Sequence, residues 1–321
     1  MQAIIQPRYG SPDVLELTDL PVPQPKADEV LVRVRASSVN AADIETLGGM
    51  FLVRMASPLR PAHRIPGSDV AGVVEQVGSA VTSLAPGDEV FGDLSEFGYG
   101  AFAEFVSAKA AAFWPRPAGL TFEEAAAVPS AAWVAIKGIR DQVVLGAGSE
   151  VLVNGAGGGM GTYAVQMAVA RGAAVTGVDR ADKLELVRSL GAVRVIDYQA
   201  VDYTRQPERY DLIIDVFARR SVRDSRRALK PAGAYTVVGA STPRILQSFL
   251  LGALLTRTSD QRIGPLFGWP HSEQDVDDVN ELIEAGAVRP VIDRVYPLAK
   301  APDAMQRVAD GDVAGKAVIS T

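Results

Sequence analysis

The chain has 321 residues, enough for two domains with buried cores, and its 48% hydrophobic and 22% charged residues are typical of a globular protein. Its net charge of −6 disfavours nucleic acid as a partner, and the absence of cysteine excludes disulfides, thiolate catalysis and cysteine-ligated zinc. Residues 1–8 lack a signal-peptide pattern, and the apolar run at 245–255 is too short to span a bilayer. We therefore expect a cytoplasmic protein without a membrane partner, and a buried helix or pocket wall at 245–255.

Residues 1–122 have the pattern of short strands separated by turns. Val32, Val34 and Ala36 alternate with arginines, which predicts a half-buried strand. A polar loop then opens a short helix at about residue 41. Further strands are expected at 70–78, 89–92 and 98–106, with proline-glycine turns between them. Short strands at this spacing favour a small barrel.

From Thr121 onward, helices alternate with strands. Thr121 and Glu124 form a capping box before an alanine-rich helix, and Ser221 and Asp224 cap a later one. The expected elements are strands at 151–154, 174–179, 193–198, 210–216 and 234–239, an edge strand at 262–267 and a helix at 275–285. Such alternation predicts a parallel, doubly wound sheet. The tail alternates again at 291–293 and 317–319 and should rejoin the first domain, which gives domains of 1–122 completed by 269–321, and 123–268.

A glycine-rich turn follows the strand at 151–154. The chain continues Gly155-Ala156-Gly157-Gly158-Gly159-Met160-Gly161 and enters an apolar helix, and the next strand ends at Asp179. The fingerprint G-x-G-x-x-G becomes Ala156-x-Gly158-x-x-Gly161, with alanine in place of its first glycine. Backbone N–H groups and a helix N-terminus at such a turn hold a pyrophosphate. We interpret the turn as a dinucleotide site; the alternative is a flexible turn between two packed elements.

Several motifs together point to one family. They are Pro66-Gly67-Ser68-Asp69-Val70-Ala71-Gly72, Pro86-Gly87-Asp88-Glu89-Val90, the glycine turn with its helix to Gln166, and Gly315-Lys316-Ala317-Val318-Ile319. With them the chain resembles, essentially end to end, the zinc-independent quinone oxidoreductase branch of the medium-chain dehydrogenase/reductase superfamily. The resemblance implies an α/β protein with a GroES-like β-barrel catalytic domain plus a Rossmann domain, and an active site in the cleft between them. It also implies a homodimer that pairs edge strands, here 261–267.

The resemblance predicts that the site holds no metal. Zinc-dependent members carry a cysteine ligand where this chain has Asn40, and Gly-His-Glu where it has Gly67-Ser68-Asp69. A catalytic zinc needs three protein ligands, and neither of the two histidines, His63 and His271, is in register. Without a Lewis acid a simple ketone is a poor substrate, whereas a quinone or an α,β-unsaturated carbonyl delocalises the incoming charge.

Catalytic candidates follow from the resemblance. Asn40 and Asp43 lie on the loop that faces the nicotinamide in relatives; the alternatives are that Asn40 caps the short helix and Asp43 pairs with an arginine. Glu45 stands where relatives often carry a tyrosine, and Tyr99 is a possible replacement, unless it is a core aromatic. Ser130 either touches the nicotinamide or is an ordinary buried serine.

The sequence contains opposing signals for the choice between NADH and NADPH. Asp179 is the residue that NAD enzymes use for the ribose hydroxyls, whereas Arg180 and Lys183 would favour a 2′-phosphate, unless they simply lie on a solvated helix start. We expect NADPH, with NAD possible. The resemblance places the cofactor on residues from both halves of the chain: Ala156, Gly157, Gly158, Gly159, Met160, Gly161, Asp179, Arg180, Lys183, Tyr198, Val216, Gly239 and Lys316.

These observations predict an NADPH-dependent oxidoreductase that reduces a quinone or an enone. One alternative is an enoyl reductase of a biosynthetic pathway, which performs the same chemistry on a tailored substrate. Another is a non-catalytic binding protein, as some zeta-crystallin relatives are. The acidic net charge and the intact glycine turn argue against a non-catalytic role.

Overall fold

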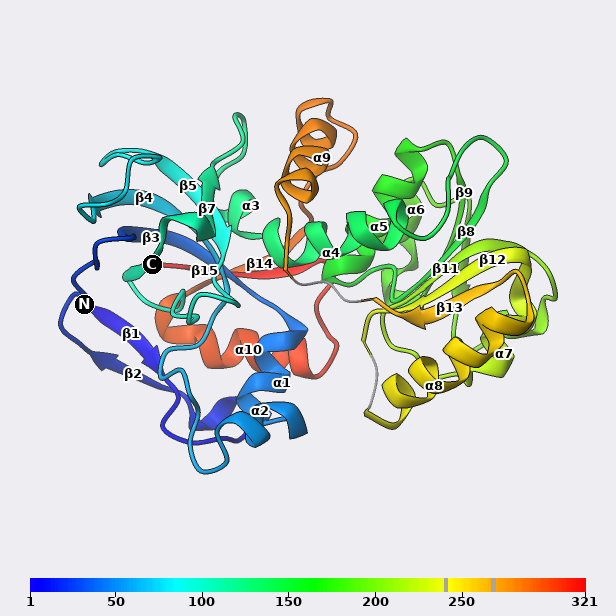
Figure 1. The fold of residues 1–321 in the computed structure, drawn as a ribbon, viewed down its shortest axis with the longest axis horizontal. Coiled ribbons are helices and arrows are strands. Elements are labelled where there is room, and N and C mark those ends of the chain that lie inside the picture. The colour runs from blue at the N-terminus through cyan, green and yellow to red at the C-terminus, as the bar shows by residue number, and fades with distance from the viewer. Residues whose placement is uncertain (240–241, 267–269) are drawn as a thin grey trace. The chain divides into compact units, whose positions relative to one another are not determined.

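The computed structural model describes residues 1–239, 242–266 and 270–321 and divides into two compact units (Figure 1). Unit 1 comprises Met1–Ser130 and Pro290–Thr321, and unit 2 comprises Ala131–Arg289. The boundaries between the two units follow residues 130 and 289, whereas the sequence pattern predicts domain boundaries after residues 122 and 268. The helix at Phe122–Ala126 is therefore part of unit 1, and the helix at Glu273–Glu284 is part of unit 2.

Unit 1 consists mainly of β-strands, with four helices that lie wholly within it. The strands are β1 (Gln2–Ile5), β2 (Glu16–Asp19), β3 (Glu29–Val39), β4 (Asp69–Val77), β5 (Glu89–Asp93), β6 (Phe105–Lys109), β7 (Phe113–Pro115), β14 (Ile292–Pro297) and β15 (Lys316–Ser320). The helices are α1 (Ala41–Gly48), α2 (Phe51–Ala56), α3 (Phe122–Ala126) and α10 (Ala301–Ala309).

The long strand β3 organises unit 1. The main sheet has the order β14-β15-β3-β4-β5-β7. Along one edge of β3, the first half of the strand pairs with β6 and the second half pairs with β15. Its valines at alternate positions, among them Val30, Val32 and Val34, are buried in a hydrophobic core of the unit. The C-terminal strand β15 thus pairs with an N-terminal one, and the predicted return of the tail to the first domain is confirmed.

One predicted strand of unit 1 is wrong in its extent. The strand expected at 98–106 begins only at Phe105. Gly98, Tyr99 and Gly100 all have positive φ angles, of 107°, 59° and 109°, which no extended strand can contain. The segment before β6 is therefore a turn, and Tyr99 lies on a loop rather than on a barrel strand.

Unit 2 contains a six-stranded parallel sheet. Its strands are β8 (Glu150–Asn154), β9 (Ala174–Asp179), β10 (Arg194–Asp197), β11 (Tyr210–Asp215), β12 (Leu229–Val237) and β13 (Arg262–Pro265). Its helices are α5 (Gly159–Ala170), α6 (Leu184–Ser189), α7 (Val222–Ala228), α8 (Thr242–Thr258) and α9 (Glu273–Glu284), and α4 (Pro129–Arg140) begins at its boundary with unit 1.

The strand order β10-β9-β8-β11-β12-β13 is that of a doubly wound dinucleotide-binding sheet, as predicted. Right-handed crossovers place α5 and α6 on one face and α7 and α8 on the other (Figure 1). The order reverses between β8 and β11, and ligands of such sheets bind beyond the carboxyl ends of the strands at this reversal.

The local helix signals are confirmed, but of the two alternatives for 245–255, a buried helix or a pocket wall, the buried helix is wrong. Thr121 and Ser221 cap α3 and α7 through their side-chain oxygens. The run 245–255 does lie in α8, yet Leu246, Phe249 and Leu250 expose 55%, 54% and 60% of their surfaces, so this helix is not buried. The predicted edge strand is present at 262–265, and the end of the predicted range, Phe267, lies outside the described residues. Within the described ranges, no helix has the length and apolarity to cross a bilayer.

Candidate active site and nucleotide turn

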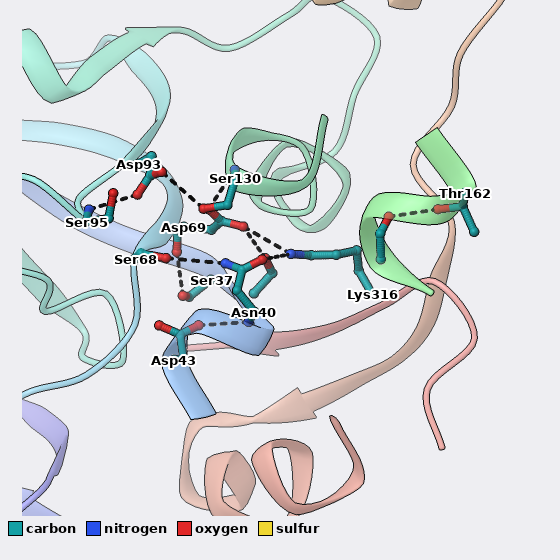
Figure 2. A network of polar contacts seen from close by, with 12 residues as sticks. Ser37, Asn40, Asp43, Ser68, Asp69, Asp93, Ser95, Ser130, Thr162 and Lys316 are labelled. Carbon is teal, nitrogen blue, oxygen red and sulfur yellow. Dashed lines mark hydrogen bonds and ion pairs between the residues drawn. The ribbon is translucent and has the colours of Figure 1, made fainter. Parts of the chain in front are cut away.

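A buried polar cluster in unit 1 gathers most of the residues that the sequence pattern marks for catalysis (Figure 2). Strand register assembles it, because β15, β3, β4 and β5 are neighbours in the sheet. Ser38 pairs with Asp69 and Asp69 with Asp93, while Ala317 pairs with Val39, so that Lys316 comes beside Asn40. We call the following set the polar cluster: Ser38, Asn40, Asp43, Ser68, Asp69, Asp93, Ser130 and Lys316.

Asp69 is the central acceptor of the polar cluster. Its Oδ1 accepts from the backbone N–H of Ser130 at 3.0 Å and from the Ser130 hydroxyl at 2.7 Å, and its Oδ2 accepts from the Ser38 hydroxyl at 2.8 Å. The same Ser130 hydroxyl lies 3.1 Å from Asp93 Oδ2. Ser130 occupies the first turn of α4, so the Asp69 carboxylate also satisfies a helix N-terminal N–H. Ser130 is thus a buried structural partner of Asp69.

Lys316 supplies the positive charge of the polar cluster. Its side chain is 2% exposed, and its Nζ lies 3.2 Å from Asp69 Oδ2 and donates to Asn40 Oδ1. The amide nitrogen of Asn40 donates to the Ser68 hydroxyl at 3.3 Å. Asn40 is also the N-cap residue of α1 and forms a capping box with Asp43, so its side chain contacts Lys316 and Ser68 in addition to capping the helix.

Asp43 is a buried carboxyl at the start of α1. Its Oδ2 accepts the backbone N–H of Asn40 at 2.8 Å, while its Oδ1 is buried without a hydrogen-bond partner in the described structure. Burial raises the pKa of Asp43 to about 7, and the nearby Asp69 adds to the rise, against the opposing effects of the Asn40 N–H and Lys316. Asp43 therefore carries a proton in a substantial fraction of molecules at neutral pH. The alternative of an arginine partner for Asp43 does not hold, because its partner is the Asn40 backbone.

Tyr99 lies beside the polar cluster on the loop before β6. Its left-handed backbone, with φ of 59°, is unusual for a tyrosine and marks local strain. Its ring lies 5.2 Å from the ring of His63. Burial raises the pKa of the Tyr99 phenol, as do the charges of Asp43 and Asp93. Glu45, by contrast, lies on the exposed face of α1.

The glycine turn of unit 2 has the geometry of a phosphate site. Gly155 has φ of 86°, and a Cβ at Gly161 would lie 1.9 Å from the Gly155 carbonyl oxygen, so α5 and β8 can approach only through glycine. Helix α5 starts after Gly158, and Gly158, Gly159 and Met160 are partly exposed. The first N–H groups of a helix have no intrahelical acceptor, so this turn offers donors to an anion. Ala156, in place of the first glycine of the fingerprint, is fully buried.

Asp179 holds the glycine turn in place. Its Oδ2 accepts the Gly157 N–H at 2.7 Å and its Oδ1 accepts the Arg180 N–H at 2.8 Å, and the side chain is 6% exposed. Arg180 pairs with Asp182 at 2.9 Å, and Lys183 packs against Gly157, where a Cβ would lie 2.8 Å from Lys183 Cβ. All three candidates therefore lie at the turn, and Asp179 has a structural task there that sequence reasoning missed.

The remaining cofactor candidates of unit 2 follow the ends of other strands. Tyr198 follows β10, and the Arg219 guanidinium lies 5.7 Å from its ring centroid. Val216 donates its N–H to the Asn154 carbonyl at 3.0 Å, and a Cβ at Gly239 would lie 2.5 Å from the Val216 carbonyl oxygen. These residues line the carboxyl edge of the sheet. Lys316, by contrast, lies in the polar cluster of unit 1.

Among the side chains of the two candidate sites that sequence reasoning did not single out are Asp93, Ser38 and Arg219. Asp93 lies at the end of β5, after the motif Pro86 to Val90, and Ser38 precedes the polar loop, but no local pattern links either to Asp69. Arg219 lies shortly after the predicted strand at 210–216, and its place beyond the carboxyl end of a strand could have marked it as a cofactor candidate.

Comparison with known proteins identifies the family. The alcohol dehydrogenase GroES-like domain matches residues 26–118, and the zinc-binding dehydrogenase family matches residues 190–319. The 2-methylene-furan-3-one reductase of Solanum lycopersicum is 33% identical over 326 residues, covering 97% of this chain and 76% of that protein. The chloroplastic NADPH-dependent alkenal/one oxidoreductase of Arabidopsis thaliana is 31% identical over 331 residues, covering 99% and 79%. The structure of the quinone oxidoreductase from Coxiella burnetii is similar with a TM-score of 0.89 and 26% identity, over 100% of this chain and 99% of that one.

A GroES-like domain together with a Rossmann sheet and its glycine turn defines a medium-chain dehydrogenase/reductase, and the chain belongs to that superfamily. Within it, the chain belongs to the zinc-independent quinone oxidoreductase branch and is an NAD(P)H-dependent oxidoreductase. Across the residues described, no three His, Cys, Asp or Glu side chains gather to hold a metal. The donor set also does not fit zinc, because Asn40 and Asp69 already bind the ammonium of Lys316.

Proposed function

We propose that this enzyme uses NADPH to reduce a quinone or an α,β-unsaturated carbonyl compound, with Asn40 and Asp43 at the substrate. The observation that carries the proposal is the polar cluster, where an amide polarised by an ammonium group stands beside a carboxyl with a pKa of about 7. The named activities of the relatives, an alkenal/one oxidoreductase, a 2-methylene-furan-3-one reductase and a quinone oxidoreductase, support the substrate class.

NADPH supplies the hydride in this proposal. The residues of the glycine turn suit its pyrophosphate, because Gly158 and Gly159 carry no side chain and the first N–H groups of helix α5 have no intrahelical acceptor. Val216 follows β11, at the reversal in strand order, and Gly239 follows the next strand, β12, where the rest of the cofactor would extend.

Asn40 is the donor to the substrate oxygen in this proposal. When hydride adds to a conjugated carbon, negative charge develops on the carbonyl oxygen, and preorganised donors stabilise it. The Asn40 amide nitrogen donates one N–H to Ser68, and no described residue accepts the other. A conjugated acceptor spreads the charge over several atoms, so such donors suffice.

Asp43 holds the proton that completes the reduction. A general acid works best when its pKa is near the operating pH, and burial brings the pKa of Asp43 to about 7. Tyr99 is the less suitable donor, because burial raises the pKa of its phenol further above neutrality.

The preference for NADPH over NADH rests on the cations at the turn. Arg180 follows Asp179 directly, Lys183 lies four residues after it, and Arg219 lies over Tyr198 at the next strand end, so these three cations are the candidates to contact the 2′-phosphate. The Asp179 carboxylate, which would repel this phosphate, accepts a backbone N–H on each oxygen and is 6% exposed. NADH use at lower affinity is compatible with this arrangement.

We also propose a homodimer and a cytoplasmic location. Strand β13 forms the edge of the unit 2 sheet, and its outer backbone groups can pair with a second copy. The location rests on the absence of cysteine, which suits a reducing compartment, although the Arabidopsis relative is chloroplastic.

The proposal is tested by coenzyme oxidation with a panel of acceptors. We expect NADPH to be consumed with quinones and open-chain enones, and not with saturated ketones of similar size. Turnover of saturated ketones at comparable rates would contradict the proposed substrate class, and equal or better use of NADH would contradict the coenzyme preference.

A further inference from the structure

The burial of Lys316 requires an explanation. A lysine is rarely buried unless it is paired, and Lys316 and Asp69 expose 2% and 0% of their side chains. The family resemblance suggests a contact between Lys316 and the cofactor, but its Nζ is bound to Asn40 and Asp69 within unit 1. We therefore look for a role of the Lys316 ammonium within the polar cluster.

The ammonium group determines how the Asn40 amide is oriented. An ammonium only donates hydrogen bonds, so the end of the amide that faces it must be Oδ1. This turns Nδ2 toward the Ser68 hydroxyl, 3.3 Å away. A cation on the amide oxygen also strengthens both amide N–H groups as donors, since hydrogen bonds in a chain polarise one another.

Asp69 keeps the ammonium in position. Its carboxylate is itself fixed by Ser38 and by the backbone and hydroxyl groups of Ser130. Three elements, β3, β4 and α4, therefore hold the acceptor to which Lys316 is bound. Such support is what a precisely oriented donor requires.

We propose that Lys316 is a positioning residue, whose ammonium orients and polarises the Asn40 amide so that this amide donates to the substrate oxygen as charge develops there. The inference rests on the proposed function, because it takes Asn40 as the donor to a quinone or enone. Asn40 stands where zinc-dependent relatives carry a metal ligand, and Lys316 brings a positive charge to this position from the last strand of the chain.

The test removes the ammonium without leaving an unpaired buried carboxylate. Lys316→Met is made together with Asp69→Asn and compared with Asp69→Asn alone, and Lys109→Met, at an exposed ion pair with Asp28, is the matched control. Circular dichroism establishes that each variant is folded. For each, kcat and KM are measured with one enone and one quinone, and Kd is measured for NADPH.

We expect a loss that depends on the acceptor. Removing one donor to a developing oxyanion costs roughly a hundredfold or more in kcat, and we expect about this loss with the enone. A quinone spreads the charge over its ring, so its kcat should fall by less than about tenfold. The Kd of NADPH should not change, and Lys109→Met should behave as the wild type.

A double-mutant cycle with Asn40→Leu tests whether Lys316 acts through Asn40. Once the amide is gone, loss of the ammonium should lower kcat with the enone no further. An equal loss with both acceptors, a full loss in the Asn40→Leu background or a weaker Kd for NADPH would each overturn the inference. If the wild type reduces neither acceptor, the proposed function itself is wrong and the inference falls with it; if it reduces both but lacks this pattern, only the inference is wrong.

Discussion

The substitution Asp179→Asn separates two roles that the Asp179 carboxylate could have. In many NAD enzymes an acid at this position binds the ribose hydroxyls, and its loss would harm NADH while relieving repulsion of the NADPH phosphate. Here the carboxylate also ties the glycine turn to β9, through the N–H groups of Gly157 at 2.7 Å and Arg180 at 2.8 Å. We therefore expect Asp179→Asn to weaken the binding of both coenzymes.

The magnitude follows from the two hydrogen bonds. An asparagine keeps one neutral acceptor oxygen, so one of the two backbone N–H groups loses its acceptor and the other exchanges a charged acceptor for a neutral one. A hydrogen bond to a charged group contributes about 1.5–3 kcal/mol, which corresponds to a roughly ten- to hundredfold loss in affinity if the bound turn depends on it. Because the Asp179 side chain is 6% exposed, water replaces little of this contribution.

The assay is a fluorescence titration of NADPH and NADH against the wild type, Asp179→Asn and a matched control. Asp88→Asn serves as the control, because Asp88 likewise accepts a backbone N–H, that of Ala85 at 2.8 Å, but lies in unit 1 in the turn between β4 and β5. We expect parallel losses for the two coenzymes in Asp179→Asn and little change in the control. Tighter NADPH binding together with weaker NADH binding would refute the structural role of Asp179.

Other predictions follow from the same contacts. Arg180→Ala should weaken NADPH by about ten- to hundredfold and leave NADH nearly unchanged, and a coenzyme preference unaffected by this change would contradict the role of Arg180. Burial raises the pKa of Asp43 from 3.8 to about 7, so protonation of Asp43 favours the folded state. Its contribution to the free energy of unfolding, up to about 4 kcal/mol, is fully present below about pH 4 and is lost as the pH rises through 7. Asp43→Asn should remove this loss in urea unfolding at pH 5 and pH 8, and an unchanged pH dependence would show that Asp43 titrates normally. Chelators should leave activity intact, since the polar cluster suits no metal; stoichiometric zinc lost together with activity would be inconsistent with this. Light scattering at micromolar concentration should give twice the chain mass of 33.9 kDa, and a monomer would rule out pairing through β13.

Signals that act over a few residues could be predicted from the sequence. The caps at Thr121 and Ser221 involve partners three positions away, and the turn after β8 requires glycine for steric reasons that are local. The alternation of strands and helices in unit 2 then limits the sheet to very few topologies.

The polar cluster could not be assembled from the sequence. Lys316 and Asn40 are 276 positions apart, and their contact depends on the register in which β15 joins β3. The family resemblance implies a contact between Lys316 and the cofactor, but a resemblance carries residue identities and not the protein partners of a buried ammonium. Nor could hydropathy reveal that Leu246 and Phe249 are exposed, because an apolar run predicts burial whether or not another surface covers it.

Product analysis with deuterated coenzyme tests the central claim most directly. An open-chain enone is reduced with NADPH that carries deuterium at the reactive nicotinamide carbon, and the product is examined by NMR and mass spectrometry. Hydride transfer to a conjugated carbon, with Asn40 at the carbonyl oxygen, predicts a saturated ketone with deuterium at the carbon β to the carbonyl. An allylic alcohol with deuterium on the former carbonyl carbon would contradict the account.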